Sequence, residues 1–310
     1  AIVGLTIHAI IRFLFLFFYL ISYYRISIRK IRFDYLKKQW EYILPMGAGM
    51  IVGSLGKHAD KIFLLSLLSA NDFAIYSIGN LNIPFIAMLY GAIGSVILPK
   101  ISTYSKNNEH GKASTLWKNM ILKNAIITIP VVIFFFIQAE SLFILLFTEK
   151  YVFSANIFRI LLLILLIQML GHGYILRGFA KTKTIFYGKI IRTLISLVLG
   201  YFLVTYLGVI GAAVTYLVSF SVNAFYQLEK TRQLCHVKWF DLLPWIDFFL
   251  ITLITLPSIV SILIANYLIE GVFLQLSVSS VLYFILLIIP LYKSNYIDKL
   301  GLNQILFNKK

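Results

Sequence analysis

Residues 47–66 read GAGMIVGSLGKHADKIFLLS and set small and charged residues into an otherwise apolar run. Successive residues of a helix rotate by about 100°, so Gly49, Gly53 and Gly56 fall on one face. The same face continues into Lys57, Asp60 and Lys61. The opposite face carries Ile51, Val52, Leu55, Ala59, Ile62 and Phe63. The stretch therefore predicts a membrane helix with one face toward lipid and one small, polar face.

The composition of the whole chain supports a membrane location. Of its 310 residues, 60% are hydrophobic and 13% are charged, whereas roughly a quarter of the residues of a soluble domain are charged. Apolar runs of about 20 residues are long enough to cross a bilayer as helices. The sequence lacks the alternating pattern of barrel strands, so we expect an all-α, polytopic membrane protein.

Nine hydrophobic segments are predicted to cross the membrane as helices. They cover residues 1–24, 42–68, 73–99, 119–138, 152–176, 184–207, 209–228, 242–268 and 272–292. Every second gap between them is basic, and these gaps and the final tail, together with Lys123, Lys189 and Arg192 just inside the adjoining segments, hold 23 of the 28 Lys and Arg residues. The net charge of +16 thus reflects topology and not a nucleic-acid partner, which requires a basic face on a soluble module.

The charge pattern also predicts an orientation. Basic gaps face the cytoplasm, so the start of the chain is expected outside and its C-terminus in the cytoplasm. The chain starts with Ala1 and has an odd number of segments, so we expect residues to be missing upstream. The basic segment 25–41 is predicted to be a cytoplasmic linker, either a plain topogenic loop or an amphipathic stretch at the interface.

The charges at membrane depth are the candidate site residues. Ionisable groups inside a bilayer usually face a bundle interior or an aqueous cavity. Lys57 and Lys61 are predicted to line an anion-binding cavity, with Asp60 balancing its charge or coupling to an ion. The alternatives are that Lys57 and Asp60, three residues apart, neutralise each other, or that the lysines reach the outer interface.

Further candidate residues lie in neighbouring helices. Arg12 and Arg159 are predicted to join the same cavity, although Arg159 is close enough to the outer end of its helix to snorkel. His58 has either a packing role or a role in proton handling. Asn80 and Asn82 either line the cavity or bridge helices, and packing is the commoner role of such amides.

The sequence predicts no enzyme, metal site or cofactor. Its five histidines are scattered, no catalytic set can be singled out, and a phosphate-binding glycine loop is missing. The single Cys235 excludes an internal disulfide framework. The external loops are short, which disfavours a membrane glycosyltransferase, ligase or polymerase.

Several short motifs resemble those of the Wzx-like polysaccharide and O-antigen flippases, members of the multidrug/oligosaccharidyl-lipid/polysaccharide (MOP) exporter superfamily. The motifs are HADKIFLL (58–65), FAIYS (73–77), ILPKIS (97–102), LFTEKY (146–151), FRIL (158–161), GFAKTK (178–183) and GVIGAA (208–213). Ala74 and Thr148 stand where the family commonly has glycine. The order and spacing of the motifs carry the resemblance across residues 42 to about 235.

The resemblance implies two six-helix lobes around a central cavity, often followed by two extra helices. On that plan residues 1–24 form the last helix of a truncated N-terminal lobe, and residues 42–228 form the MATE/MOP-like C-terminal lobe. Residues 229–310 then supply a cytoplasmic loop, the two additional helices and a cytoplasmic tail. Five helices are expected upstream, which agrees with the odd number that the charge pattern requires.

The resemblance also implies a function. We expect a flippase in the bacterial or archaeal cytoplasmic membrane that moves an undecaprenyl-pyrophosphate-linked oligosaccharide outward, with membrane lipid and polysaccharide polymerase or other assembly machinery as partners. One alternative is a multidrug or small-molecule exporter of the same fold, coupled to H⁺ or Na⁺. Another is a membrane enzyme of glycan assembly. The predominantly basic charges at membrane depth favour an anionic substrate over a cationic one.

Overall fold

A computed structural model describes residues 2–24, 33–294 and 296. Within these ranges the regular structure is helical, which confirms the all-α fold class. The helices are α1 (Ile2–Tyr24), α2 (Phe33–Leu67), α3 (Ala70–Gly79), α4 (Pro84–Lys106), α5 (His110–Ile137), α6 (Ala139–Phe147), η2 (Glu149–Tyr151), α7 (Ser154–Gln168), α8 (Tyr174–Gly178), α9 (Thr182–Cys235), α10 (Trp239–Leu242), α11 (Trp245–Leu268) and α12 (Val272–Lys293). The chain divides into two compact units, residues 1–44 and 45–310.

The helices of the described ranges fit a multi-pass membrane protein. Six of them are long and apolar enough to span a bilayer, namely α1, α4, α5, α9, α11 and α12. Helix α9 contains two helices joined at Gly208, whose φ of 58° and ψ of −133° suit glycine alone. Helix α7 is apolar but shorter than these six. Helix α2 is not among the six candidate spans because its polar stripe lowers its hydrophobicity.

The first unit contains α1 and the start of α2. The side chains of α1 that the structure describes are exposed, as expected for a lipid-facing or partner-facing helix. Helix α2 already begins at Phe33, so residues 33–41 of the expected linker are helical. Residues 25–32 of that linker lie outside the described residues.

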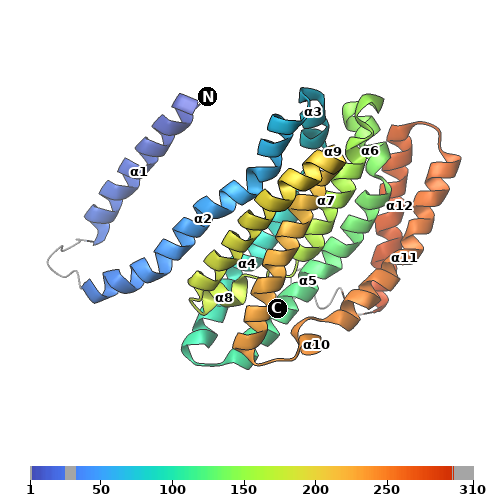
Figure 1. The fold of residues 1–310 in the computed structure, drawn as a ribbon. Helices are drawn as coiled ribbons and strands as arrows, with labels where there is room; N and C mark the ends of the chain where they lie inside the picture. Colours follow the sequence, from blue (N-terminus) through green and yellow to red (C-terminus); the bar gives the residue numbers. More distant parts are fainter. Residues whose placement is uncertain (1, 25–32, 295, 297–310) are drawn as a thin grey trace. The chain divides into compact units, whose positions relative to one another are not determined.

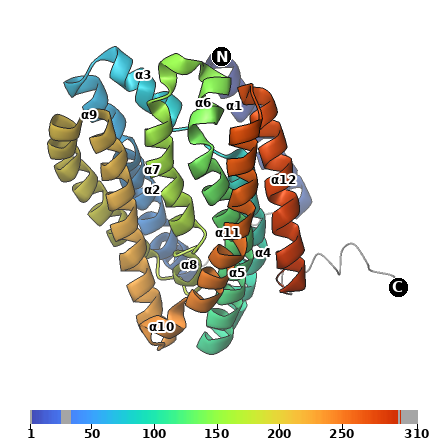
Figure 2. The same cartoon turned by 90° about the vertical axis from the view of Figure 1, so that its right-hand side faces the viewer.

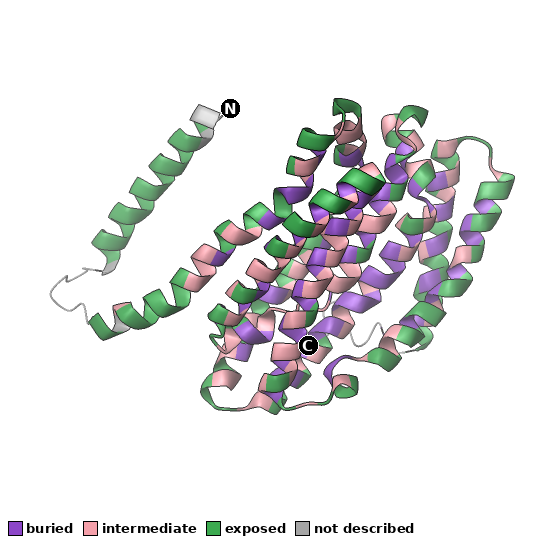
Figure 3. Cartoon of the chain, viewed as in Figure 1, coloured by how far each residue is buried: buried purple, intermediate pink, exposed green. Residues whose placement is uncertain are grey.

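The second unit is a bundle of antiparallel helices with two distinct ends (Figures 1 and 2). The connections from α4 to α5, from α8 to α9 and from α9 to α11 lie at one end, called the basic end here. The short helices α3 and α6 and the turn between α11 and α12 lie at the opposite end. Buried residues face the inside of this bundle, and exposed residues on its outer surfaces include many large apolar side chains (Figure 3). That distribution suits a protein whose solvent is lipid.

Two predicted helices are broken in the structure. The segment 73–99 divides into α3 and α4, because Asn80 ends the first helix and Pro84 opens the second. Proline is suited to a first helical turn, so it starts a helix here instead of kinking one. The segment 152–176 divides at residues 169–173 into α7 and α8. The second break shapes the site described next.

Polar contacts attach the last two helices to the bundle. Gln138 Nε2 donates to Ser279 Oγ at 2.7 Å and to Asn266 Oδ1 at 3.3 Å. Tyr283 is fully buried, and its hydroxyl donates to the carbonyl oxygen of Pro130 at 2.9 Å. Helices α11 and α12 therefore belong to the same compact unit as the helices before them.

Candidate anion-binding cavity

A cavity of about 500 Å³ lies between α2, the break after α7, α8 and both halves of α9. Its lining residues are Met50, Gly53, Ser54, Lys57, His58, Gly171, His172, Gly173, Tyr174, Arg177, Ile185, Lys189, Arg192, Phe220, Asn223 and Gln227. Lys57 is 10 residues before the end of α2, about 15 Å at 1.5 Å per residue. The cavity thus reaches membrane depth.

The charged side chains that line this cavity are basic. Lys57 comes from α2, Arg177 from α8, and Lys189 and Arg192 from the first half of α9. The described lining contains no Asp or Glu. An anion that enters this space therefore meets several cations in an environment where charge interactions are stronger than in water.

The break after α7 forms one wall of the cavity. Gly171 has a φ of +54°, a left-handed conformation that ends the helical path. Side chains of α5 donate hydrogen bonds to the backbone carbonyl groups of the break. Asn124 Nδ2 donates to Met169 O at 2.9 Å, and Trp117 Nε1 donates to Leu170 O at 3.0 Å. Irregular backbone at membrane depth is tolerated where protein partners satisfy it or where it lines a cavity.

The glycine face of α2 packs against α9. A Cβ at Gly49 or at Gly53 would lie 3.2 Å from Cδ of Lys189, and a Cβ at Gly56 would lie 2.9 Å from Cα of Thr193. The hydroxyl of Thr193 donates to Val52 O at 2.9 Å, and that of Ser196 donates to Gly56 O at 3.1 Å. Small residues let the two helices approach, as the pattern in residues 47–66 predicts.

Arg192 is the most constrained cation of the cavity. Its guanidinium carbon lies 4.9 Å from the ring centres of both Tyr216 and Phe220. Nε and Nη2 of the same group are buried without a hydrogen-bond partner among the described residues. Aromatic rings hold the cation in place, and its N–H groups remain available to a ligand.

The predicted polar face of α2 separates into two parts. Lys57 and His58 line the cavity, whereas Lys61, one turn farther along, does not. Asp60 is 1% exposed and accepts a hydrogen bond from the hydroxyl of Tyr76. It makes none of the ion pairs found in the described structure, so pairing with Lys57 is not its role here.

Helical phase explains this separation. Asp60 is aligned with the glycines that pack on α9, so it is buried in the helix interface. Ala59 is also buried, against the expectation that it faces lipid, whereas Ile51, Leu55 and Ile62 are exposed as expected. Lys61 is not among the described lining residues of this cavity, and its role in anion binding stays a prediction, as does the coupling role of Asp60.

Arg159 is not among the described lining residues of this cavity, and its role in anion binding stays a prediction. Its Nη1 forms an ion pair with Glu140 at 2.9 Å and a hydrogen bond with Asn156 at 3.1 Å, and its Nε donates to Phe136 O at 3.0 Å. These contacts hold it at the end of the bundle opposite the basic end, because Glu140 belongs to α6. Arg159 therefore lies near the first turns of its helix and contacts α6, as the snorkelling alternative anticipates.

The remaining predicted residues lie outside this cavity. Arg12 is an exposed residue of α1 in the first unit, and its role stays a prediction. Asn80 and Asn82 line a separate pocket of about 80 Å³, which Tyr216 also borders. Tyr216 therefore both borders this small pocket and contacts the guanidinium of Arg192. The described residues contain no group of three metal-ligating side chains.

Arg177, Lys189 and Arg192 are the functional candidates that sequence reasoning missed. The positive-inside rule already accounts for these three cations, because they belong to or adjoin the basic gap between segments 152–176 and 184–207. Arg192, however, lies eight residues inside the predicted segment 184–207, and Lys189, Arg192, Thr193 and Ser196 follow helical spacing. A search for a second polar stripe, complementary to that of α2, is the signal that identifies them.

Comparisons with known proteins agree with this architecture. Lipid II flippase MurJ in an inward closed conformation gives a TM-score of 0.64 at 17% identity, covering 85% of this chain and 56% of that chain. A MOP superfamily transporter from Pyrococcus furiosus gives a TM-score of 0.52 at 18% identity, covering 84% of this chain and 66% of that chain. The chain therefore has the MOP transporter fold and spans less than two thirds of either protein.

The sequence was also compared with curated proteins and with protein-family models. No curated protein matches the chain significantly. A family model described as polysaccharide biosynthesis protein matches residues 1–156, which is half of the chain. The chain therefore belongs to this family of polysaccharide biosynthesis proteins.

Proposed function

We propose that the whole protein to which this chain belongs is a flippase for a lipid-linked, phosphate-bearing oligosaccharide. It moves the repeat unit of a surface polysaccharide, such as O-antigen or capsule, from the cytoplasmic to the outer leaflet by alternating access. The observation that carries the proposal is the cavity at membrane depth with Lys57, Arg177, Lys189 and Arg192 and no lining carboxylate. The family and the fold both support it.

The cavity fits the chemistry of an undecaprenyl-pyrophosphate headgroup. Two unit charges 4 Å apart attract by about 4 kcal/mol at an effective dielectric of 20, so several cations offset the cost of removing a pyrophosphate from water. The histidines and the amides of Asn223 and Gln227 supply hydrogen-bonding groups for sugar hydroxyls. The polyprenyl chain stays in lipid, where it needs no protein contact.

Net outward transport requires a source of free energy in addition to substrate binding. A transporter that binds its substrate equally in both conformations does not drive net movement, so an ion or downstream consumption of the product must supply the difference. The carboxylate of Asp60 is buried and accepts a hydrogen bond from the hydroxyl of Tyr76. Asp60 is the candidate for coupling transport to H⁺ or Na⁺. A polysaccharide polymerase or other assembly machinery is the candidate consumer.

The membrane orientation follows from charge. We propose a bacterial or archaeal cytoplasmic membrane, with the basic end of the bundle in the cytoplasm. The start of this chain then lies outside and its C-terminus inside. In this orientation the end of the bundle that carries α3 and α6 faces outward.

A flipping assay tests the function. The complete protein is reconstituted in liposomes with a fluorescent polyprenyl-pyrophosphate oligosaccharide, and outward movement is read by membrane-impermeant quenching. The double variant Lys57→Gln with Lys189→Gln is expected to lose most of the activity. The matched control is Lys106→Gln with Lys118→Gln, which removes the same charge outside the cavity. Equal rates for both double variants would show that this cavity does not receive the substrate.

The same samples separate the alternative functions. Transport of cationic dyes without movement of the lipid-linked sugar supports a multidrug exporter. A new glycan product in the mass spectrum supports an enzyme. The basic lining of the cavity disfavours the first outcome, because a cation site requires acidic or carbonyl ligands.

A further inference from the structure

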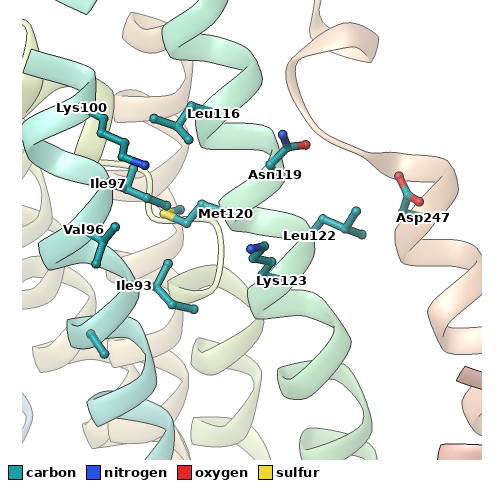
Figure 4. Close-up of a pocket in the computed structure, with 11 residues that line it drawn as sticks. Ile93, Val96, Ile97, Lys100, Leu116, Asn119, Met120, Leu122, Lys123 and Asp247 are labelled. Atoms are coloured by element: carbon teal, nitrogen blue, oxygen red, sulfur yellow. The ribbon is translucent and has the colours of Figure 1, made fainter. Parts of the chain in front are cut away.

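A second and larger cavity lies on another side of the bundle. It has a volume of about 900 Å³ and is formed by α4, α5 and the start of α11. Its lining residues are Ala92, Ile93, Val96, Ile97, Lys100, Leu116, Asn119, Met120, Leu122, Lys123 and Asp247 (Figure 4). It shares none of the residues that line the anion-binding cavity. We call it the lateral groove.

The lateral groove combines an apolar wall with two cations from neighbouring helices. Lys100 of α4 and Lys123 of α5 extend toward the space between these helices (Figure 4). Ile93, Val96, Ile97 and Leu122 supply apolar surface beside them, and Val96 is 60% exposed. This arrangement offers one region to a charged headgroup and another to a hydrocarbon chain.

The position of the two lysines along their helices places them near the basic end. Lys100 is six residues before the end of α4, and Lys123 is thirteen residues after the start of α5. At 1.5 Å per residue these separations are about 9 Å and about 20 Å. One lysine therefore lies near headgroup level and the other lies deeper, where an uncompensated charge is costly.

The charges of the groove leave a net positive site. Neither lysine forms an ion pair within the described part of the chain. Asp247 is the acidic residue of the lining, and its Oδ1 accepts a hydrogen bond from the hydroxyl of Tyr296 at 2.9 Å. Among the described lining residues, two lysines and one carboxylate have a formal charge of +1, which a single phosphodiester neutralises.

We propose that the lateral groove binds an anionic phospholipid of the surrounding membrane. The phosphodiester lies between Lys100 and Lys123, the amide of Asn119 donates a further hydrogen bond, and an acyl chain follows the apolar wall. A free phosphate leaves this wall uncovered, and a lipid with neutral net charge leaves the site at +1. The lipid acts as a structural ligand at the junction of α4, α5 and α11 and is distinct from the transported substrate.

Lipid binding to the complete protein tests the inference. Delipidated protein is titrated with phosphatidylglycerol, phosphatidylcholine or soluble glycerol phosphate, and binding is followed by native mass spectrometry and by the thermal midpoint. Phosphatidylglycerol is expected to bind at least about tenfold more tightly than phosphatidylcholine. The double variant Lys100→Gln with Lys123→Gln should weaken phosphatidylglycerol binding by roughly ten- to thirtyfold.

Two further variants keep the test decisive. Lys106→Gln with Lys118→Gln takes one lysine from each of the same helices outside the groove and should leave the affinity unchanged. Asp247→Asn removes the negative charge but keeps an oxygen for Tyr296, so it should tighten phosphatidylglycerol binding. The first variant should leave phosphatidylglycerol affinity unchanged and the second should raise it, and neither removes a cation from the groove.

Three results would overturn the proposal. They are equal binding of both phospholipids, equal binding by wild type and the Lys100→Gln, Lys123→Gln protein, and full competition by glycerol phosphate, which indicates a free-phosphate site. If this double variant does not fold, the Asp247→Asn protein decides, because unchanged affinity there contradicts the charge argument. Loss of lipid binding with intact flipping separates this site from the proposed transport function.

Discussion

Arg192 is the residue whose replacement tests the anion-binding cavity most directly. Its Nε and Nη2 have no hydrogen-bond partner among the described residues, so both N–H groups are available to a phosphate that enters the cavity. A hydrogen bond to a charged group contributes about 1.5–3 kcal/mol. Arg192→Gln should therefore weaken binding of a prenyl pyrophosphate by roughly 10- to 150-fold. The thermal midpoint of the ligand-free protein should change little, because loss of the contacts with Tyr216 and Phe220 opposes the gain from removing a cation without a hydrogen-bond partner among the described residues.

Arg159→Gln is the matched control with the opposite expectation. Arg159 also comes from a membrane helix and also lies near an aromatic ring, that of Phe136. Its guanidinium, however, already binds Glu140 and a backbone carbonyl. Its replacement should lower stability by about 1–2 kcal/mol, with some screening of the partly exposed pair, and leave ligand affinity unchanged.

Farnesyl pyrophosphate and farnesol serve as probes for the complete protein in detergent, with affinity from thermophoresis and stability from scanning fluorimetry. The difference between the two probes isolates the contribution of the phosphate groups. The reasoning fails if Arg192→Gln binds farnesyl pyrophosphate as wild type does. It also fails if this variant loses stability while Arg159→Gln loses affinity, since the two arginines would then have exchanged roles.

Two further predictions concern the packing of α2. Gly56→Leu places a Cβ 2.9 Å from Cα of Thr193, so the helices must separate, and we expect aggregated protein on size-exclusion chromatography. Gly91→Leu has no neighbour within 4 Å of the new Cβ and should elute as wild type does; an equal yield of both variants refutes the packing argument. Tyr76→Phe removes the donor to buried Asp60 and should cost about 1–3 kcal/mol of stability, measured by thermal unfolding. An unchanged midpoint shows that the hydroxyl is dispensable.

The membrane architecture was predictable from composition and charge. Apolar runs specify helices because the bilayer leaves the backbone few alternatives. The orientation that the basic gaps indicate stays a prediction. The two broken helices were not. The break at residues 169–173 depends on donors from Trp117 and Asn124, which lie about 50 residues earlier in the chain and belong to another helix. No local pattern reveals such a partner.

The site was predictable in part. The α2 pattern identifies Lys57 because a charge on a small-residue face cannot turn to lipid without cost. The same pattern does not show where the packed interface ends and the cavity begins, so it cannot separate Lys57, which lines the cavity, from Lys61, which is not in its described lining. Arg192 was overlooked because a cation near a basic gap has a sufficient topological explanation. Its depth in the helix was the overlooked clue.

The glycines at positions 49 and 53 act together on one side chain. Both face the aliphatic stem of Lys189, with Cδ 3.2 Å from each ideal Cβ position. They form a slot that stores most of a long side chain and leaves its ammonium group at the cavity. A methyl group at either position would fill the slot and move the lysine stem into the space open to a ligand. The size of the residue at these two positions therefore sets how far the Lys189 ammonium group extends into the cavity, so a change in the helix interface alters the cavity without replacing any of its lining cations.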